Sequence, residues 1–166
     1  MRIAVIGSRS LQVDHLEDYL PANVSRILSG GATGVDACAR RYAISRAIPY
    51  EEYRPDYRRY GKGAPLRRNL DMIKHADHVI AFWDGQSPGT SHTIMKCKEL
   101  GIPCTVYRLH QPLITRTEAL AFARLAEAGR EPAYPWEDIL DSVPDSWPYQ
   151  RLREEELYPP TDVDEE

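Results

Sequence analysis

The sequence predicts an α/β protein: a Rossmann-like, open, mostly parallel sheet with helices on both faces. Three observations predict it. The first apolar run, Arg2 to Ile6, ends directly in Gly7-Ser8-Arg9, as a buried strand does when it meets a turn. The run Asp77 to Trp83 is apolar without polar alternation, which is typical of a central parallel strand covered on both faces. The succession of strand, glycine-rich turn and helix occurs twice along the chain.

Five short runs are the predicted strands. The second is apolar, the third alternates weakly, and the last follows a glycine that ends a helix. In chain order they are Arg2–Ile6, Val24–Leu28, Pro49–Arg54, Asp77–Trp83 and Ile102–Leu109.

Four segments between these strands have helical spacing. Val13, Leu16 and Leu20 lie on one face of the first, which stops before Pro21. Pro65 suits the first turn of the third helix. The four predicted helices are Val13–Leu20, Val35–Ile48, Pro65–His75 and Thr90–Leu100.

Length and charge limit the function classes. A chain of 166 residues with 42% hydrophobic residues can form one domain with a real core. The net charge of −4 argues against a broad nucleic-acid surface, although a local basic pocket is compatible with it. No apolar run reaches the length of a membrane span, and the N-terminus lacks the apolar core of a signal peptide. We therefore expect a cytoplasmic protein with no membrane partner and no broad nucleic-acid surface.

The cysteines and histidines give no sign of a metal site. Cys38, Cys97 and Cys104 are far apart in the sequence and are interpreted as small core residues. The five histidines do not have metal-ligand spacing. The sequence therefore predicts neither a metal nor a cofactor.

The composition changes near residue 110. A helical segment, Thr115 to Ala128, precedes a proline-rich tail with an acidic end. We therefore divide the chain into one folded domain, residues 1–110, and a C-terminal extension, residues 111–166. The apolar helix offers a surface for a homodimer.

The first glycine-rich turn runs from Ser29 to Asp36. Glycines permit positive φ and leave room for a ligand, while the first turn of the following helix offers unpaired N–H groups. This combination is an anion site, most often for phosphate. The alternative is a tight loop whose glycines serve turn geometry only. Asp36 either caps the helix, which we favour, or reaches a ligand hydroxyl.

The second glycine-rich turn runs from Asp84 to Ser91 and leads into the fourth helix. The carboxyl ends of parallel strands lie at one edge of a sheet, so the two turns should face each other across a crevice. Ser8 and Arg9 follow the first strand and should face the same crevice, where arginine can pair with an anion.

A third segment, Pro55 to Gly63, interleaves tyrosines with basic residues. Such a segment can stack a base and hold phosphates. An exposed loop whose tyrosines pack on the domain edge explains it equally well. Arg67, Arg68 and Asn69 lie near the start of the next helix, from which they can return to the ligand edge.

Four motifs in this order resemble the YspA, cpYpsA-related branch of the SLOG superfamily, the Smf/DprA and LOG-related Rossmann-like proteins. The resemblance covers about Arg2 to Leu109. It rests on Ile6-Gly7-Ser8-Arg9, Ser29-Gly30-Gly31-Ala32-Thr33-Gly34-Val35-Asp36, Gly61-Lys62-Gly63-Ala64 with Arg68-Asn69, and Ala81-Phe82-Trp83-Asp84-Gly85 with Ser87, Gly89 and Thr90.

The resemblance implies binding or sensing of a nucleotide or a nucleotide-derived ligand, similar to NAD or ADP-ribose, between the two turns. Related hydrolases cleave the N-glycosidic bond of nucleoside monophosphates with an arginine and a glutamate. Arg68 matches that arginine, but Thr93 stands at the glutamate position and cannot supply a carboxylate. Binding without chemistry is therefore the preferred hypothesis. The alternative is such a hydrolase, with Asp84 or Asp36 as its carboxylate.

These arguments give one set of candidate site residues. Arg68 and Asp84 are the candidate catalytic residues. The expected ligand-binding residues are Gly7, Ser8, Arg9, Ser29, Gly30, Gly31, Ala32, Gly34, Asp36, Arg68, Asn69, Trp83, Asp84, Gly89, Thr90 and Ser91.

Overall fold

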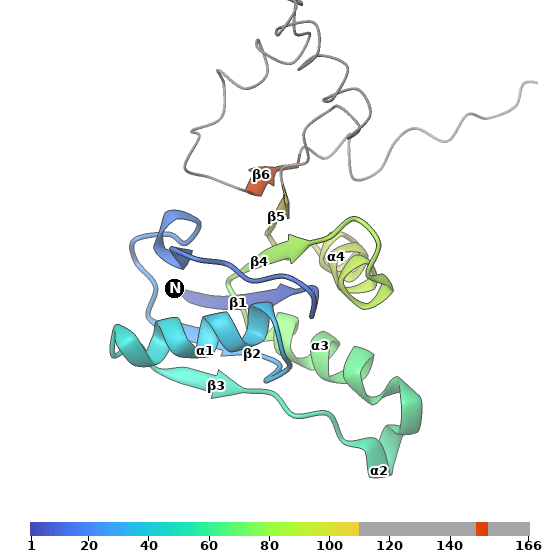
Figure 1. Ribbon diagram of the computed structural model, residues 1–166. Coiled ribbons are helices and arrows are strands. Elements are labelled where there is room, and N and C mark those ends of the chain that lie inside the picture. The colour runs from blue at the N-terminus through green and yellow to red at the C-terminus, as the bar shows by residue number, and fades with distance from the viewer. Residues whose placement is uncertain (110–148, 153–166) are drawn as a thin grey trace, which may run out of the picture. The chain divides into compact units, whose positions relative to one another are not determined.

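The computed structural model describes residues 1–109 and 149–152, and its strands form one sheet in the order β3-β2-β1-β4-β5-β6 (Figure 1). Neighbouring strands from β3 to β5 are parallel, with Val5 of β1 opposite Ile80 of β4. The strands are β1 (Arg2–Gly7), β2 (Arg26–Ser29), β3 (Tyr50–Glu52), β4 (His78–Trp83), β5 (Cys104–Leu109) and β6 (Tyr149–Arg151).

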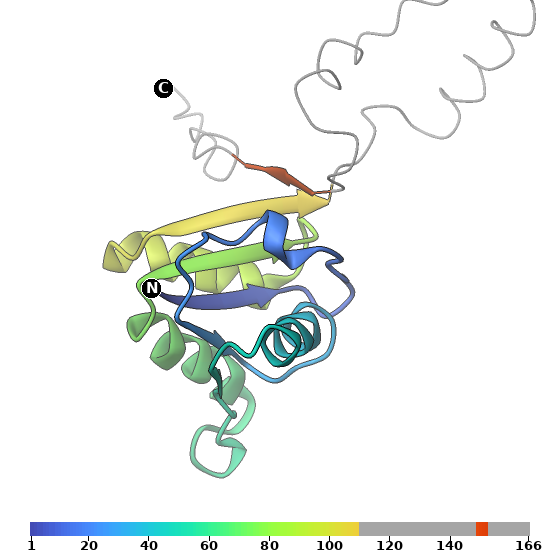
Figure 2. The same cartoon turned by 90° about the vertical axis from the view of Figure 1, so that its left-hand side faces the viewer.

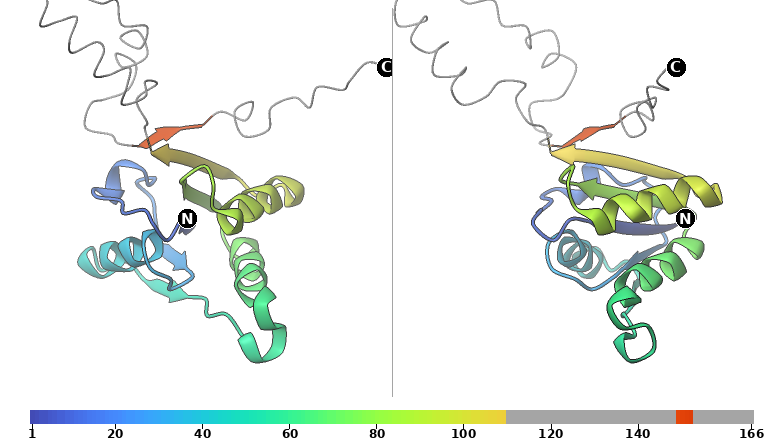
Figure 3. Two further views of the ribbon diagram at one scale, coloured as in Figure 1. Left: turned by 45° about the vertical axis from the view of Figure 1, so that its right-hand side comes forward. Right: turned by 90° about the vertical axis from the view of Figure 1, so that its right-hand side faces the viewer.

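Helices cover both faces of the sheet. The helical segments are η1 (Leu16–Asp18), α1 (Val35–Ser45), α2 (Tyr57–Tyr60), η2 (Gly61–Gly63), α3 (Ala64–Lys74) and α4 (Pro88–Leu100). Figures 2 and 3 show α1 on one side of the sheet and α3 with α4 on the other. The predicted Rossmann-like fold class is confirmed.

The core lies between the sheet and the helices on each side. Ala4 and Ile6 of β1 pack into a cluster with Met72 and Ile73 of α3 and Cys97 of α4. Ile3 and Val5 alternate with Ala4 and Ile6 along β1, so their side chains point to the opposite face of the sheet, and both are fully buried as well. Burial on both faces explains why β1 and β4 read as continuous apolar runs.

The helix predicted over Val13–Leu20 is wrong in extent, because the structure contains only the short 3₁₀ turn η1 there. His15 has a φ of 54°, a left-handed conformation that interrupts a helix. The segment is held instead by side-chain packing. Tyr19 is edge-on to Phe82 and to Tyr107, with ring centroids 5.2 and 5.0 Å apart.

Two further differences concern the Tyr/Arg segment and the C-terminal part. The segment Pro55–Gly63 contains α2 and η2, which Figure 1 shows extending beyond β3. Strand β6 was not predicted; after it, the Leu152 N–H donates to the Val106 carbonyl at 2.8 Å. The expected helix Thr115–Ala128 lies outside the described residues, so the division at residue 110 and the homodimer stay predictions.

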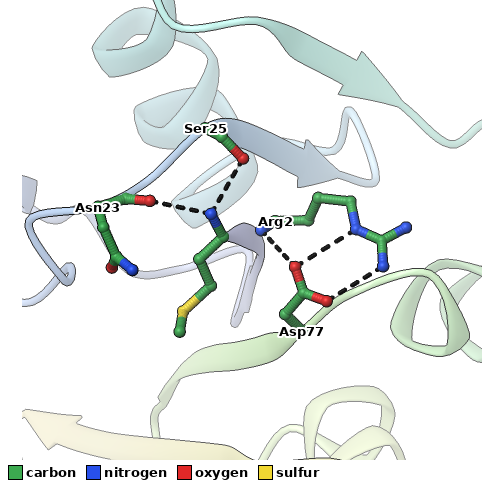
Figure 4. Close-up of polar contacts among 5 residues, drawn as sticks. Arg2, Asn23, Ser25 and Asp77 are labelled. Atoms are coloured by element: carbon green, nitrogen blue, oxygen red, sulfur yellow. Dashed lines mark hydrogen bonds and ion pairs between the residues drawn. The ribbon is translucent and has the colours of Figure 1, made fainter.

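Polar contacts fix the start of β1 (Figure 4). The Met1 amino group donates to the Asn23 carbonyl at 2.9 Å and to Ser25 Oγ at 3.0 Å. The Arg2 guanidinium pairs with the Asp77 carboxylate, and the Arg2 backbone N–H donates to the same carboxylate at 2.7 Å. The Met1 bonds join the start of β1 to the residues before β2, and the Arg2 bonds join it to the start of β4, at the edge opposite the strand ends that carry the candidate site.

Cys38 and Cys97 are buried, as predicted, and Cys104 is half-buried. No group of three or more histidine, cysteine, aspartate or glutamate side chains suited to a metal ion occurs among the described residues. Within the same residues, no helix is long and apolar enough to cross a bilayer.

Candidate functional site

A pocket of about 420 Å³ lies at the carboxyl end of β1. Four segments surround it: the residues after β1, the first glycine-rich turn, one face of α3 and the start of α4. This is the edge at which open α/β sheets bind ligands. Its lining residues are Ile6, Gly7, Ser8, Arg9, Ser10, Ala32, Asp36, Pro65, Leu66, Arg68, Asn69, Met72, Ser87, Gly89 and Thr90.

A second pocket of about 300 Å³ adjoins the first. Arg9, Ala32 and Arg68 line both pockets and therefore form their common wall. The smaller pocket is completed by Gly30, Gly31, Thr33, Pro55 and Tyr57. We call the two spaces the main pocket and the side pocket.

The structure distributes the predicted ligand-binding residues over three places. The main pocket is lined by Gly7, Ser8, Arg9, Ala32, Asp36, Arg68, Asn69, Gly89 and Thr90. Gly30 and Gly31 line the side pocket. Neither pocket is lined by Ser29, Gly34, Trp83, Asp84 or Ser91. Parts of both glycine-rich turns thus reach one pocket, as the crevice hypothesis requires.

Gly34 serves close packing rather than ligand contact. Its φ is 75°, and a Cβ there would collide with the backbone carbonyls of Ser8 and Arg9. Gly30 similarly leaves room for the Arg68 guanidinium. At these two positions the turn-geometry explanation of the glycines is the better one, because the missing side chains admit protein atoms.

The Asp36 side chain forms a hydrogen bond within the first glycine-rich turn. Its Oδ2 accepts a hydrogen bond from the Ala32 N–H at 3.1 Å, so this amide is already used. Asp36 lies in the first turn of α1, and its bond to Ala32 joins that turn to the loop before the N-cap residue Gly34, so the favoured capping role and the ligand role both stay predictions. Burial raises the pKa of Asp36, while the Ala32 N–H and the charge of Arg68 oppose that rise. A carboxylate in the wall repels phosphate but suits a sugar hydroxyl.

Arg68 is buried and held by three hydrogen bonds. Nη1 donates to the carbonyls of Gly30 at 2.5 Å and Tyr53 at 3.1 Å, and Nε donates to Asn69 Oδ1 at 2.8 Å. Burial lowers the pKa of Arg68, and the Asp36 carboxylate opposes this. Arginine stays charged even so. The bonds therefore fix a positive charge in the wall between the two pockets.

The start of α4 is open toward the main pocket. Pro88 is its first residue, and the N–H groups of Gly89 and Thr90 belong to the first turn, which has no intrahelical acceptors. A Cβ on Gly89 would meet no atom within 4 Å. An anion can therefore approach these amides at the positive end of the helix dipole.

Thr93 links α4 to α3. It is 1% exposed, donates from Oγ1 to the Gly89 carbonyl at 3.0 Å, and accepts from Asn69 Nδ2 at 3.1 Å. Asn69 in turn orients Arg68. Thr93 stands where the related hydrolases have a glutamate. In this structure it belongs to a buried hydrogen-bond network that fixes the walls of the pocket.

Asp84 points into its own loop. Its carboxylate accepts from the N–H groups of Gln86 and Ser87 and from Ser87 Oγ, at 2.9, 2.6 and 2.7 Å. Trp83 Nε1 donates to the Ser87 carbonyl at 3.2 Å in the same loop. Neither residue lines the main or the side pocket, and Asp84 stabilises its own loop, so its catalytic role stays a prediction that these contacts do not favour.

These contacts predict a pH dependence. Burial raises the pKa of Asp84, but the hydrogen bonds from Ser87 and Gln86 outweigh burial and hold it at about 2. That is below the unfolded value of about 3.9. The resulting stability is present above about pH 4 and is lost as the pH falls through about 2. We expect wild type to exceed Asp84→Asn in unfolding free energy near pH 6, with the difference shrinking toward pH 2 in urea titrations. A difference that stays constant with pH contradicts this.

Several lining residues were missed. Pro65, Leu66 and Met72 form the α3 wall of the main pocket, and Ser10 and Ile6 complete the β1 side. A signal for the α3 wall was present: Pro65, Arg68, Asn69 and Met72 are spaced as one helix face. Once Arg68 is a candidate, that spacing identifies the other three.

The protein was compared with family models, curated proteins and solved structures. No family model matches the chain. It is 35% identical over 83 residues to Gene 61 protein of Mycobacterium phage D29; the match covers 46% of this chain and 66%, just under two thirds, of that relative. A solved structure of DNA processing protein A from Helicobacter pylori matches with a TM-score of 0.51 and 20% identity, over 86% of this chain and 79% of the other.

The fold resembles that of DNA processing protein A. At 20% identity this likeness shows the fold, and membership of the SLOG superfamily stays a prediction. The structure of that neighbour is described for its mode of binding single-stranded DNA. The prediction of no broad nucleic-acid surface is therefore corrected: a net charge of −4 does not exclude a nucleic-acid partner for a chain whose fold resembles that of a protein that binds single-stranded DNA.

Proposed function

We propose that the main pocket binds the phosphate of a nucleotide at the start of α4. The observation that carries this is the open position at Gly89, where first-turn amides face a pocket that Arg9 and Arg68 also line. Arg68 is fixed through Nε and Nη1, so Nη2 is the part of the guanidinium directed to a ligand. Amides and guanidinium groups are the usual donors to phosphate.

The rest of the pocket suits a nucleoside. Asp36 offers a carboxylate oxygen to a sugar hydroxyl, while Ile6, Leu66 and Met72 supply apolar surface for a base. The volume of about 420 Å³ is within the range of small-molecule sites. These features support a free nucleotide or nucleotide derivative, similar to NAD or ADP-ribose. Membership of the YspA branch is proposed from the four sequence motifs. We further propose that the protein works in the cytoplasm.

Binding without chemistry is the favoured form of this function. Thr93 is committed to Asn69 and Gly89, and Asp84 to its loop, so Asp36 is the carboxylate left in the pocket wall. N-glycosidic hydrolysis is the alternative. It predicts release of adenine from AMP that Asp36→Asn abolishes.

A second candidate is binding of single-stranded DNA, favoured by the ligand of DNA processing protein A. In that case the main pocket holds one nucleotide unit of the strand. Direct titration distinguishes the two candidates, because a labelled single-stranded oligonucleotide binds only under the second; a free nucleotide that shares the main pocket should then displace it.

Arg9→Ala tests the proposed site with little risk to the fold. Arg9 is exposed, lines both pockets and contributes a charge to phosphate. We expect the variant to bind AMP at least tenfold more weakly by calorimetric titration, since a charge-assisted bond contributes about 1.5–3 kcal/mol. Arg26→Ala, at the amino end of β2 and ion-paired with Glu51, is the matched control and should bind as wild type does. Equal affinities of all three proteins would place the phosphate elsewhere.

A further inference from the structure

The main and side pockets share a wall that carries both arginines. Arg9 and Arg68 line each pocket, as does Ala32. A phosphate held by these guanidinium groups therefore has space on both sides. The main pocket accounts for one side, and the proposed function leaves the side pocket unused.

The side pocket has the composition of a stacking site. Pro55 and Tyr57 line it together with Gly30, Gly31 and Thr33 of the first glycine-rich turn. Tyr57 is 58% exposed, so much of its side chain is accessible to a ligand. Base–aromatic stacking needs such an accessible ring.

Tyr57 is held in place by its own helix. It is the first residue of α2, whose start is capped by the Asp56 carboxylate accepting from the Arg59 N–H at 3.1 Å. The other tyrosine of α2 is already engaged: Arg59 and Arg67 lie over the Tyr60 ring, 5.2 and 5.0 Å from its centroid. Tyr60 lines neither pocket.

We propose that the two pockets together bind one ligand made of two nucleoside-type units bridged by phosphate. The first unit lies in the main pocket, the bridging phosphate lies against Arg9 and Arg68, and the second base stacks on Tyr57 in the side pocket. This inference rests on the proposed function and adds the class of ligand. Two sources supply this chemistry: a soluble dinucleotide with a diphosphate bridge, and two neighbouring units of a single strand with a phosphodiester bridge.

The test compares three probes on the full chain by calorimetric titration. AMP has one unit, diadenosine diphosphate has two units on a diphosphate, and a deoxyadenylate dinucleotide has two units on one phosphodiester. We expect a two-unit probe to bind at least tenfold more tightly than AMP, because base stacking contributes about that factor or more. The better of the two probes identifies the source.

Variants of Tyr57 assign the gain to the side pocket. Tyr57→Ala should weaken the two-unit probe about tenfold and change AMP affinity less than about twofold. Tyr57→Phe keeps the ring and should bind both as wild type does. Tyr60→Ala removes a ring from the same helix and should also leave both affinities unchanged.

The outcomes separate this inference from the proposed function. If AMP binds in an Arg9-dependent manner but neither two-unit probe binds more tightly, only the two-unit ligand is refuted. If Tyr57→Ala weakens AMP and the two-unit probe equally, Tyr57 acts on the common wall and the stacking role is refuted. If none of the probes binds, both the proposed function and this inference fail.

Discussion

Replacing Gly34 by alanine should lower the unfolding free energy by roughly 4 kcal/mol. Gly34 has φ 75° and ψ −123°, a conformation that L side chains rarely adopt. A Cβ there would also overlap the carbonyl groups of Ser8 and Arg9, which belong to the loop after β1. Backbone atoms cannot rotate away as a flexible side chain can, so the loop that carries Arg9 must shift.

Gly61 provides a matched control for this substitution. It has φ 56° and ψ −134°, nearly the same backbone conformation, but a Cβ there would meet nothing within 4 Å. Gly61→Ala thus measures the conformational strain without the collision. Urea denaturation should show Gly34→Ala to be at least about 2 kcal/mol less stable than Gly61→Ala. Equal losses would mean that α1 and the loop after β1 are not packed as described.

The fold could be predicted because its signals are local. Doubly buried strands such as β1 and β4 are unbroken apolar runs, and Gly101 ends α4 in the left-handed conformation that favours glycine. Elements determined by distant contacts were not predictable in this way. The Val13–Leu20 segment is fixed by packing of Tyr19 on Phe82 and Tyr107, which lie more than sixty residues further along the chain.

In the candidate site, too, some parts could be predicted from local motifs and others depend on three-dimensional contacts. Arg9, Arg68 and most of the glycines could be identified from motifs, and the structure brings them to the two adjoining pockets, with Gly34 as the exception. The direction of a polar side chain within a loop could not be predicted from motifs. Asp84 follows a strand end like Ser8 does, yet its carboxylate turns to Gln86 and Ser87, because those amides lie two and three residues away.

The roles of Asn69 and Thr93 also depend on three-dimensional contacts. The sequence shows only that Thr93 lacks a carboxylate. The structure shows that its hydroxyl joins Asn69 to Gly89, and that Asn69 in turn orients Arg68. The same threonine that argues against hydrolysis thereby stabilises the arrangement of α3 and α4 around the pocket.

The phosphate site at the start of α4 is the claim on which the proposed function depends, and Gly89→Asp tests it most directly. The new side chain would enter open space and favour the helix N-terminus, so the unfolding free energy should stay within about 0.5 kcal/mol of wild type or rise. Its carboxylate would occupy the position of the phosphate, and AMP should bind about a hundredfold more weakly. Gly89→Asn adds a side chain of similar shape without the charge, so it controls for size and should lose less affinity for AMP. The account predicts a stable Gly89→Asp protein whose affinity for AMP is about a hundredfold lower; a stable variant that binds AMP as wild type does would contradict it.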